Sequence, residues 1–220
     1  MKNYLMLACT ILKDELLAAA AHSDVRFPIL FIPPDLHLFP DKLREYLQRT
    51  LDDLENVDVV LLPMGRCGNG TIGLRSERAT IVLPKCEDCV NLLLSGDDLC
   101  VERPGYSFFL TEGWLRTENS MPQEYLRALD KYGEETATAI MKMMYANYKY
   151  FVFIDTGTYA LPAAMAQVRE LASIVDVELT TAAGPCGVLD KMMRLELDGN
   201  FTVIPPGTPV SEAHFQSEPS

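Results

Sequence analysis

The chain contains no cluster of basic residues and no long uninterrupted apolar run. Its formal net charge is −12, whereas proteins that bind nucleic acid or anionic membranes without sequence specificity need grouped Lys and Arg. Residues 4–21 are apolar overall, but Lys13, Asp14 and Glu15 interrupt them before the ~18 residues of a membrane helix are reached. The composition predicts a cytoplasmic protein that binds neither nucleic acid nor membrane.

The sequence also lacks a second Cys-x-x-Cys pair to match Cys86-x-x-Cys89, which excludes a self-contained zinc ribbon. In a reducing cytoplasm its cysteines are expected to be thiols rather than disulfides. Any thiol site must therefore combine cysteines from distant parts of the chain. There are six candidates, at positions Cys9, Cys67, Cys86, Cys89, Cys100 and Cys186.

Short apolar runs alternate with helical patterns along the chain. Several runs are apolar on consecutive residues, which is typical of strands covered by helices on both faces. The alternation predicts an α/β fold, Rossmann-like with three layers and a largely parallel sheet. The expected strands are 4–8, 27–32, 57–62, 79–83, 150–154, 177–180 and 201–204, and the expected helices are 11–21, 41–54, 122–131, 134–148, 161–174 and 188–195.

We expect one α/β domain over residues 1–207. A long segment separates the fourth strand from the fifth, so two sub-lobes, 1–95 and 120–207, with a helical insertion over 96–149 remain an alternative. The last residues, 208–220, are polar and aperiodic, and they predict a flexible tail.

Unusual residues follow the predicted strands. Ligands of open α/β sheets bind at the carboxyl ends of strands. Cys9 ends the first strand, and His37, Cys67 and Cys89 follow the second, third and fourth. If these strands are neighbours, the three thiols converge, with His37 as a further ligand, in a pattern that favours zinc. An iron–sulfur cluster, which is also bound by thiolates, is an alternative to zinc. A second alternative is that each cysteine is a buried packing residue, which is the commonest role of a single free cysteine.

The third strand leads into the motif Gly65-Arg66-Cys67-Gly68-Asn69-Gly70. Too few residues separate it from the next strand for a phosphate-binding loop, which should open a long helix. We interpret Gly65, Gly68, Asn69 and Gly70 as a tight turn that brings Cys67 and backbone N–H groups to a cofactor. A purely structural turn is the alternative.

Other residues are assigned by their place in the pattern. Lys85, with Arg66, is expected to hold an anionic substrate group. Asp155 is expected to handle a proton or orient a ligand, or else to cap its own turn. Trp114 forms either a wall or lid over the site or part of the core. Cys186 lies at a predicted helix N-terminus, where the dipole would lower the thiol pKa.

Several short motifs follow one another along the chain: Leu7-Ala8-Cys9, Lys13-Asp14-Glu15, Leu36-His37, Gly65-x-Cys67-Gly68-Asn69-Gly70, Pro84-x-x-x-Asp88-Cys89, Leu110-Thr111-x-Gly113-Trp114, Asn147-Tyr148 and Ile154-Asp155-Thr156-Gly157. Taken in order, these motifs resemble the DUF1638 family over residues 3–207. The resemblance implies that Cys9, Cys67, Cys89 and His37 are family positions, whereas Cys86, Cys100 and Cys186 are not. Members are typical of methanogens and other anaerobes, often encoded near corrinoid-dependent methyltransferases, which implies a role in one-carbon or methyl-transfer metabolism.

Three functions remain open on the sequence. The first is a zinc-thiolate enzyme or methyl-group carrier that acts on a small or methyl-carrying substrate, with a corrinoid protein as partner. The second is a non-catalytic protein that binds or delivers a metal or corrinoid. The third is a thiol redox protein that uses Cys86 and Cys89. The oligomeric state has no sequence signature here.

Overall fold

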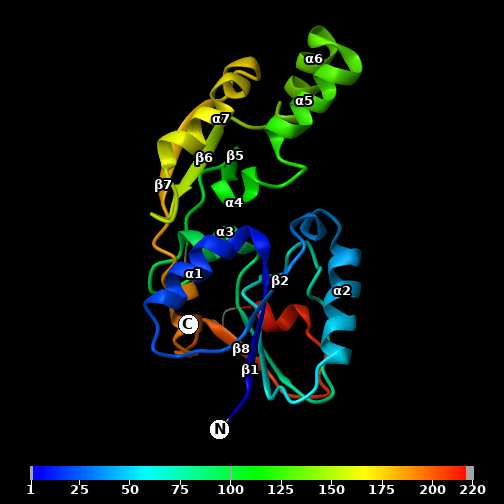
Figure 1. Ribbon diagram of the computed structural model, residues 1–220, viewed down its shortest axis with the longest axis vertical. Coiled ribbons are helices and arrows are strands. Elements are labelled where there is room, and N and C mark those ends of the chain that lie inside the picture. The colour runs from blue at the N-terminus through cyan, green and yellow to red at the C-terminus, as the bar shows by residue number, and fades with distance from the viewer. Residues whose placement is uncertain (1, 100, 217–220) are drawn as a thin grey trace. The chain divides into compact units, whose positions relative to one another are not determined.

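The computed structural model describes residues 2–99 and 101–216 (Figure 1). The chain forms two compact units. The first unit consists of residues 1–100 and 185–220, and the second unit consists of residues 101–184. Each unit contains its own sheet, so the α/β class is confirmed within both.

The first unit is built on a five-stranded sheet with the order β2-β1-β3-β4-β8. The first four strands are mutually parallel, and only β8 runs antiparallel, against β4. The sheet is thus largely parallel, as expected. The strands are β1 (Tyr4–Cys9), β2 (Ile29–Ile32), β3 (Val59–Leu61), β4 (Thr80–Pro84) and β8 (Phe201–Ile204).

Helices lie on both sides of this sheet, with α1 and α2 on opposite sides of the strands in Figure 1. Helix α2 buries Leu43, Leu47 and Leu51, which follow one another at the i, i+4, i+8 spacing of a single helical face. The result is the expected three-layer arrangement. The helical segments are η1 (Thr10–Leu12), α1 (Lys13–Ala21), η2 (Pro34–Leu38), α2 (Pro40–Asp53), α3 (Cys89–Leu94), α8 (Gly187–Met193) and η3 (Glu212–Phe215).

Strand β1 occupies a topological switch point. The chain leaves β1 to form β2 on one side of it and then crosses to form β3 on the other side. At such a point the connections on the two sides diverge, and a crevice opens outside the carboxyl ends of the strands. The end of β1 is Cys9.

The second unit contains a three-stranded parallel sheet with the order β5-β6-β7. Its core joins Phe151 and Phe153 of β6 to Val168 and Leu171 of α7. Figure 1 shows α5 and α6 side by side as a hairpin. The elements are β5 (Ser107–Leu110), α4 (Glu112–Leu115), α5 (Met121–Tyr132), α6 (Glu134–Met144), β6 (Tyr150–Asp155), α7 (Leu161–Ile174) and β7 (Glu178–Ala183).

The division of the chain differs from the expected sub-lobes. Strand β8 pairs with β4 and not with β6 or β7, so the C-terminal segment returns to the first unit. The expected tail is also ordered as far as residue 216. Val210 exchanges backbone hydrogen bonds of 2.8 Å with Gly73 and Leu74, and both Val210 and Phe215 are buried.

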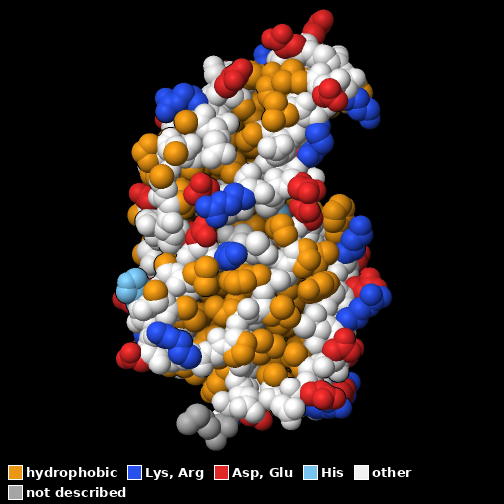
Figure 2. Space-filling model, in the orientation of Figure 1, with side chains coloured by type: hydrophobic (Ala, Val, Ile, Leu, Met, Phe, Trp, Pro, Cys, Tyr) orange, Lys and Arg blue, Asp and Glu red, His pale blue; other side chains and the backbone are white. Residues whose placement is uncertain are grey.

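The face of the first unit seen in Figure 2 carries many apolar side chains, with Lys and Arg scattered among them. Large apolar side chains of this unit that remain at least two-fifths exposed are Leu17, Leu30, Leu38, Phe39 and Val203. Among the residues that the structure describes, no helix has both the length and the apolar character needed to cross a membrane.

Candidate functional site

The carboxyl ends of β1, β3 and β4 lie next to one another because these strands are adjacent and parallel. Cys9 is the last residue of β1, Cys67 follows β3, and Cys89 follows β4. The condition on which the sequence argument depended, that these strands are neighbours, is therefore met. All three cysteines come from the same edge of one sheet.

Backbone contacts hold the loops after β3 and β4 together. Arg66 N donates to Cys86 O at 3.0 Å, and Cys67 N donates to Glu87 O at 2.8 Å. Gly65 allows this approach, since a Cβ atom there would lie 2.6 Å from Asp88 N and would also collide with Cys86 O. Glycine is required at position 65 because the two backbones touch.

The residues Cys67, Gly68 and Asn69 form a left-handed turn. Their φ angles are 48°, 61° and 73°, and Gly70 N closes the turn on Cys67 O at 3.1 Å. A left-handed conformation costs a residue with a Cβ roughly 1 kcal/mol or more. Arg66 supports the turn through bonds of 3.1 and 2.9 Å from its Nε and Nη2 to Asn69 Oδ1. The expected tight turn is present and fixes the direction of Cys67.

Two of the N–H groups that the sequence assigned to a cofactor have protein acceptors instead. Cys67 N bonds Glu87 O, and Gly70 N bonds Cys67 O. Gly70 also fits closely against α2, where a Cβ atom would lie 2.8 Å from Leu43 Cδ2. The turn therefore has a structural role. Its Cys67 N–H and Gly70 N–H groups are already bonded within the protein, so the Cys67 thiol is the group through which the turn would bind a ligand.

Cys89 is the first residue of α3, and Asp88 caps that helix. Asp88 Oδ1 accepts from Val90 N at 2.9 Å and from Asn91 N at 3.4 Å. Cys86 is buried and its thiol donates to Asp88 O at 3.4 Å. The cap therefore places Cys86 and Cys89 on either side of one ordered turn.

Cys67 lies among other ionisable groups. Burial is the largest cause of a Cys67 pKa well above the usual range, followed by the negative charges of Cys89, Cys86, Asp88 and Cys9. Cys67 therefore lies within electrostatic reach of the other three thiols. Burial also raises the pKa of Cys9, against a backbone hydrogen bond at Ile11 that lowers it.

His37 lies in η2 and is half-buried. Its Nδ1 hydrogen-bonds the Pro34 carbonyl, so in a neutral ring Nε2 is the nitrogen available to a ligand. That arrangement suits a metal ligand. Across residues 2–99 and 101–216, however, no three His, Cys, Asp or Glu side chains are arranged as a ready metal-binding group.

A family comparison bears on this site. A family model described as "Protein of unknown function (DUF1638)" matches residues 31–193, well over half of the chain. The chain belongs to the DUF1638 family. No curated protein and no solved structure matches it.

The DUF1638 match includes His37, Cys67 and Cys89, and it leaves Cys9 outside. The place of Cys9 in the candidate site therefore depends on the sheet topology. The structure also adds Cys86, which sequence reasoning set apart as a separate redox residue. Cys86 is one of the charges that raise the Cys67 pKa, and its spacing to Cys89 was the available signal.

The remaining assigned residues of this DUF1638 protein are dispersed. Lys85 is half-buried on the loop after β4, where its backbone N donates to Asn200 O at 2.9 Å. Asp155 lies in the second unit and accepts from Gly157 N at 3.2 Å, which is the turn-capping alternative. Trp114, also in the second unit, packs its ring edge-on against Phe108 at 5.4 Å, as a core residue does.

The expectation for Cys186 was wrong in its direction. Cys186 does precede the first residue of α8, but burial raises its thiol pKa to about 12, with Glu15 and Asp190 adding to the effect. The N–H groups at this helix start are occupied, because Cys186 N bonds Leu93 O and Gly187 N bonds Ser95 O. Burial and nearby acidic groups therefore outweigh the helix dipole. Cys100 lies outside the described residues, and the other five cysteines are present as thiols.

Proposed function

We propose that this protein binds a zinc ion through the thiolates of Cys9, Cys67 and Cys89. One observation carries the proposal: Cys9 ends β1, and Cys67 and Cys89 follow the adjacent parallel strands β3 and β4 at the same edge of the sheet. Soft thiolates are the ligands that zinc prefers in cytoplasmic proteins. The left-handed Cys67 supports it further, since strained backbone of this kind is concentrated at functional sites.

The thiolate and imidazole donors are of the type that zinc binds, but the cysteine side chains must change rotamer to coordinate one ion. Zinc requires three or four ligands with sulfur at ~2.3 Å, and the thiols must lose their protons on binding. We expect rotation about the Cys9 and Cys89 side-chain bonds to bring their sulfurs toward Cys67. His37 would supply its Nε2 as the fourth ligand, or that position would remain for a substrate.

The chemistry that follows from this proposal is nucleophile activation. A zinc ion held by these cysteines would lower the pKa of a bound thiol or water and so would supply a nucleophile near neutral pH. Lys85, on the same loop as Cys86, would hold an anionic group of the substrate. Asp155, which caps its own turn in the second unit, is not assigned a part in this chemistry. Methyl transfer with a corrinoid protein is the reaction we infer from the family resemblance, and a metal-delivery role is its non-catalytic counterpart.

Elemental analysis of protein purified without oxygen tests the site. We expect about one zinc per chain by the ligand count, a strong loss in Cys67→Ser, and near-complete retention in the matched variant Cys86→Ser. Full metal occupancy after Cys9, Cys67 and Cys89 are all replaced by Ser would contradict the proposal. An absorption spectrum separates zinc, which is colourless, from an iron–sulfur cluster or a corrinoid.

A dithiol redox function is the second candidate. It is favoured by the position of Cys86 and Cys89 on either side of the Asp88 cap at the start of α3, an arrangement that resembles redox-active Cys-x-x-Cys turns. It predicts reversible oxidation that Cys86→Ser abolishes. Mass spectrometry after treatment with oxidised glutathione, with Cys186→Ser as the control, distinguishes this function from zinc binding.

A further inference from the structure

The second unit contains a pocket of about 380 Å³ that the cysteine site does not use. It lies between the α5–α6 hairpin and α7, and it is lined by Pro122, Tyr125, Leu126, Leu129, Glu134, Gln167, Glu170 and Leu171. Its volume is within the range of small-molecule sites, ~300–1,000 Å³.

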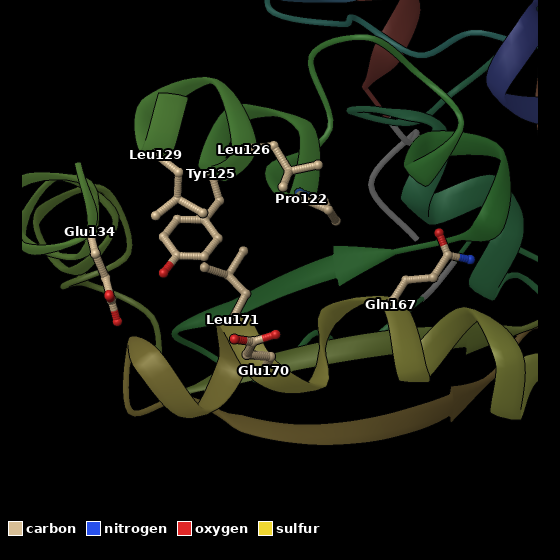
Figure 3. Close-up of a pocket in the computed structure, with 8 residues that line it drawn as sticks. All are labelled: Pro122, Tyr125, Leu126, Leu129, Glu134, Gln167, Glu170 and Leu171. Carbon is tan, nitrogen blue, oxygen red and sulfur yellow. The ribbon is translucent and has the colours of Figure 1, made fainter. Parts of the chain in front are cut away.

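The pocket has an apolar floor. Leu171 is only 3% exposed and belongs to the core of the unit, and Tyr125 packs against that core. Figure 3 shows the Tyr125 ring between Leu129 and Leu171. Leu126 lines the same space and remains 55% exposed, so the floor continues to the surface. A ligand entering here would bury a small apolar group.

The charged groups of the pocket are all acidic. Glu134 comes from the start of α6 and Glu170 from α7, and the eight lining residues include no Lys or Arg. Among the described residues, neither Glu134 nor Glu170 forms an ion pair with a Lys or Arg side chain. In Figure 3, Glu134 and Gln167 lie at the two ends and Glu170 between them. The polar rim therefore offers acceptors and negative charge around an apolar centre.

We propose that this pocket binds a small organic ammonium ion that carries an apolar or aromatic substituent. The substituent would occupy the floor beside Leu171, and the ammonium group would lie between Glu134 and Glu170. A cation is also attracted to the face of an aromatic ring, which Tyr125 supplies. Anions of the same shape would meet only like charge, so the pocket should discriminate by the sign of the ligand's charge.

The test compares three probes of one shape with the full-length protein: phenethylammonium, 2-phenylethanol and 3-phenylpropionate. We expect ligand-observed NMR titrations to show the cation binding about tenfold more tightly than the alcohol, with the anion weakest, since each of the two nearby carboxylates contributes on the order of a threefold change. In the double variant Glu134→Gln, Glu170→Gln the cation should bind no more tightly than the alcohol.

The matched control is Glu135→Gln, which removes one exposed negative charge beside Glu134 at a residue that does not line the pocket. It should leave the affinity within about twofold, given the weak effect of screened surface charges. Should the double variant fold poorly, raising NaCl from about 50 to 500 mM with the unmodified protein must weaken the cation and spare the alcohol. Equal affinities for the three probes, or no saturable binding by about 10 mM, would overturn the proposal.

Discussion

At the scale of single residues, Gly65 and Cys67 determine the conformation of the loop after β3. Gly65 lets two backbones touch, and Cys67, two residues later, adopts a left-handed conformation. The sequence motif suggested a tight turn. It did not show that this turn is pressed against the loop after β4, because contact between loops distant in the chain has no local sequence signature.

Replacing Gly65 with Ala is expected to destabilise the protein by about 1–3 kcal/mol, the range for an added atom in a packed site. The new Cβ would overlap backbone atoms at Cys86 and Asp88, which have no rotamer by which to move away. Urea unfolding of the metal-free protein measures the change. Gly96→Ala is the control, since no atom lies within 4 Å of its Cβ position; equal stability of both variants would contradict the explanation.

Cys186 is expected to be inert toward alkylation. A rise of its thiol pKa from 9.0 to about 12 lowers the thiolate fraction at pH 8 by about a thousandfold. Because the folded pKa is the higher one, the protonated thiol contributes stability below pH 9, and this contribution is lost as the pH rises toward 12. Mass spectrometry after iodoacetamide treatment checks the rate, with urea-unfolded protein as the reference. Rapid labelling of Cys186 in the folded protein would show that its thiol is not protected.

At the scale of elements, sequence periodicity predicted the long helices and the seven apolar strands within a few residues. Several short elements were missed, among them β5 and α3. No strand was expected over residues 96–149, where β5 (Ser107–Leu110) lies, and the 6 residues of α3 (Cys89–Leu94) are too few to show a repeated helical period. Its start is defined by the Asp88 cap, which directly precedes Cys89 in the sequence.

Asp88→Ala should destabilise the metal-free protein by roughly 1 kcal/mol, the usual value of a helix N-cap. The variant loses the acceptor for Val90 N and Asn91 N. If the zinc proposal holds, it should also weaken metal binding, because Cys89 is the residue that the cap positions. Asp88→Asn keeps an acceptor and should retain most of both properties. Thermal unfolding and competitive zinc titration are the measurements; identical behaviour of the Ala and Asn variants would argue against the role of the cap.

At the scale of the whole molecule, the division into two units was beyond the reach of the sequence. The chain leaves the first unit near residue 100 and re-enters it at residue 185. The pairing of β8 with β4 and the hydrogen bonds from Cys186 and Gly187 to the end of α3 reveal this return. Both depend on long-range contacts that local patterns do not encode. The placement of Cys9, Cys67 and Cys89 at one edge of the sheet, in contrast, could be predicted from the sequence, because residues that follow parallel strands meet at the same edge.

Replacement of residues 101–184 by a short Gly/Ser linker should leave the first unit folded. No strand of its sheet comes from that segment, and the flanking residues are tied by Cys186 N to Leu93 O and Gly187 N to Ser95 O. We expect a single cooperative unfolding transition by circular dichroism and, under the zinc proposal, the same metal content as the full chain. A shortened protein without cooperative unfolding would show that the first unit depends on the second.

The return of the chain to the first unit also sets an order of events during synthesis. The second unit is continuous in sequence, so it has all its residues once position 184 has left the ribosome. The first unit is synthesised earlier in large part, yet it waits for β8, whose last residue is Ile204, to cover the edge of β4. Until then β4 presents an open apolar edge, of the kind that pairs with other chains. The unit that begins first is thus the one that finishes last.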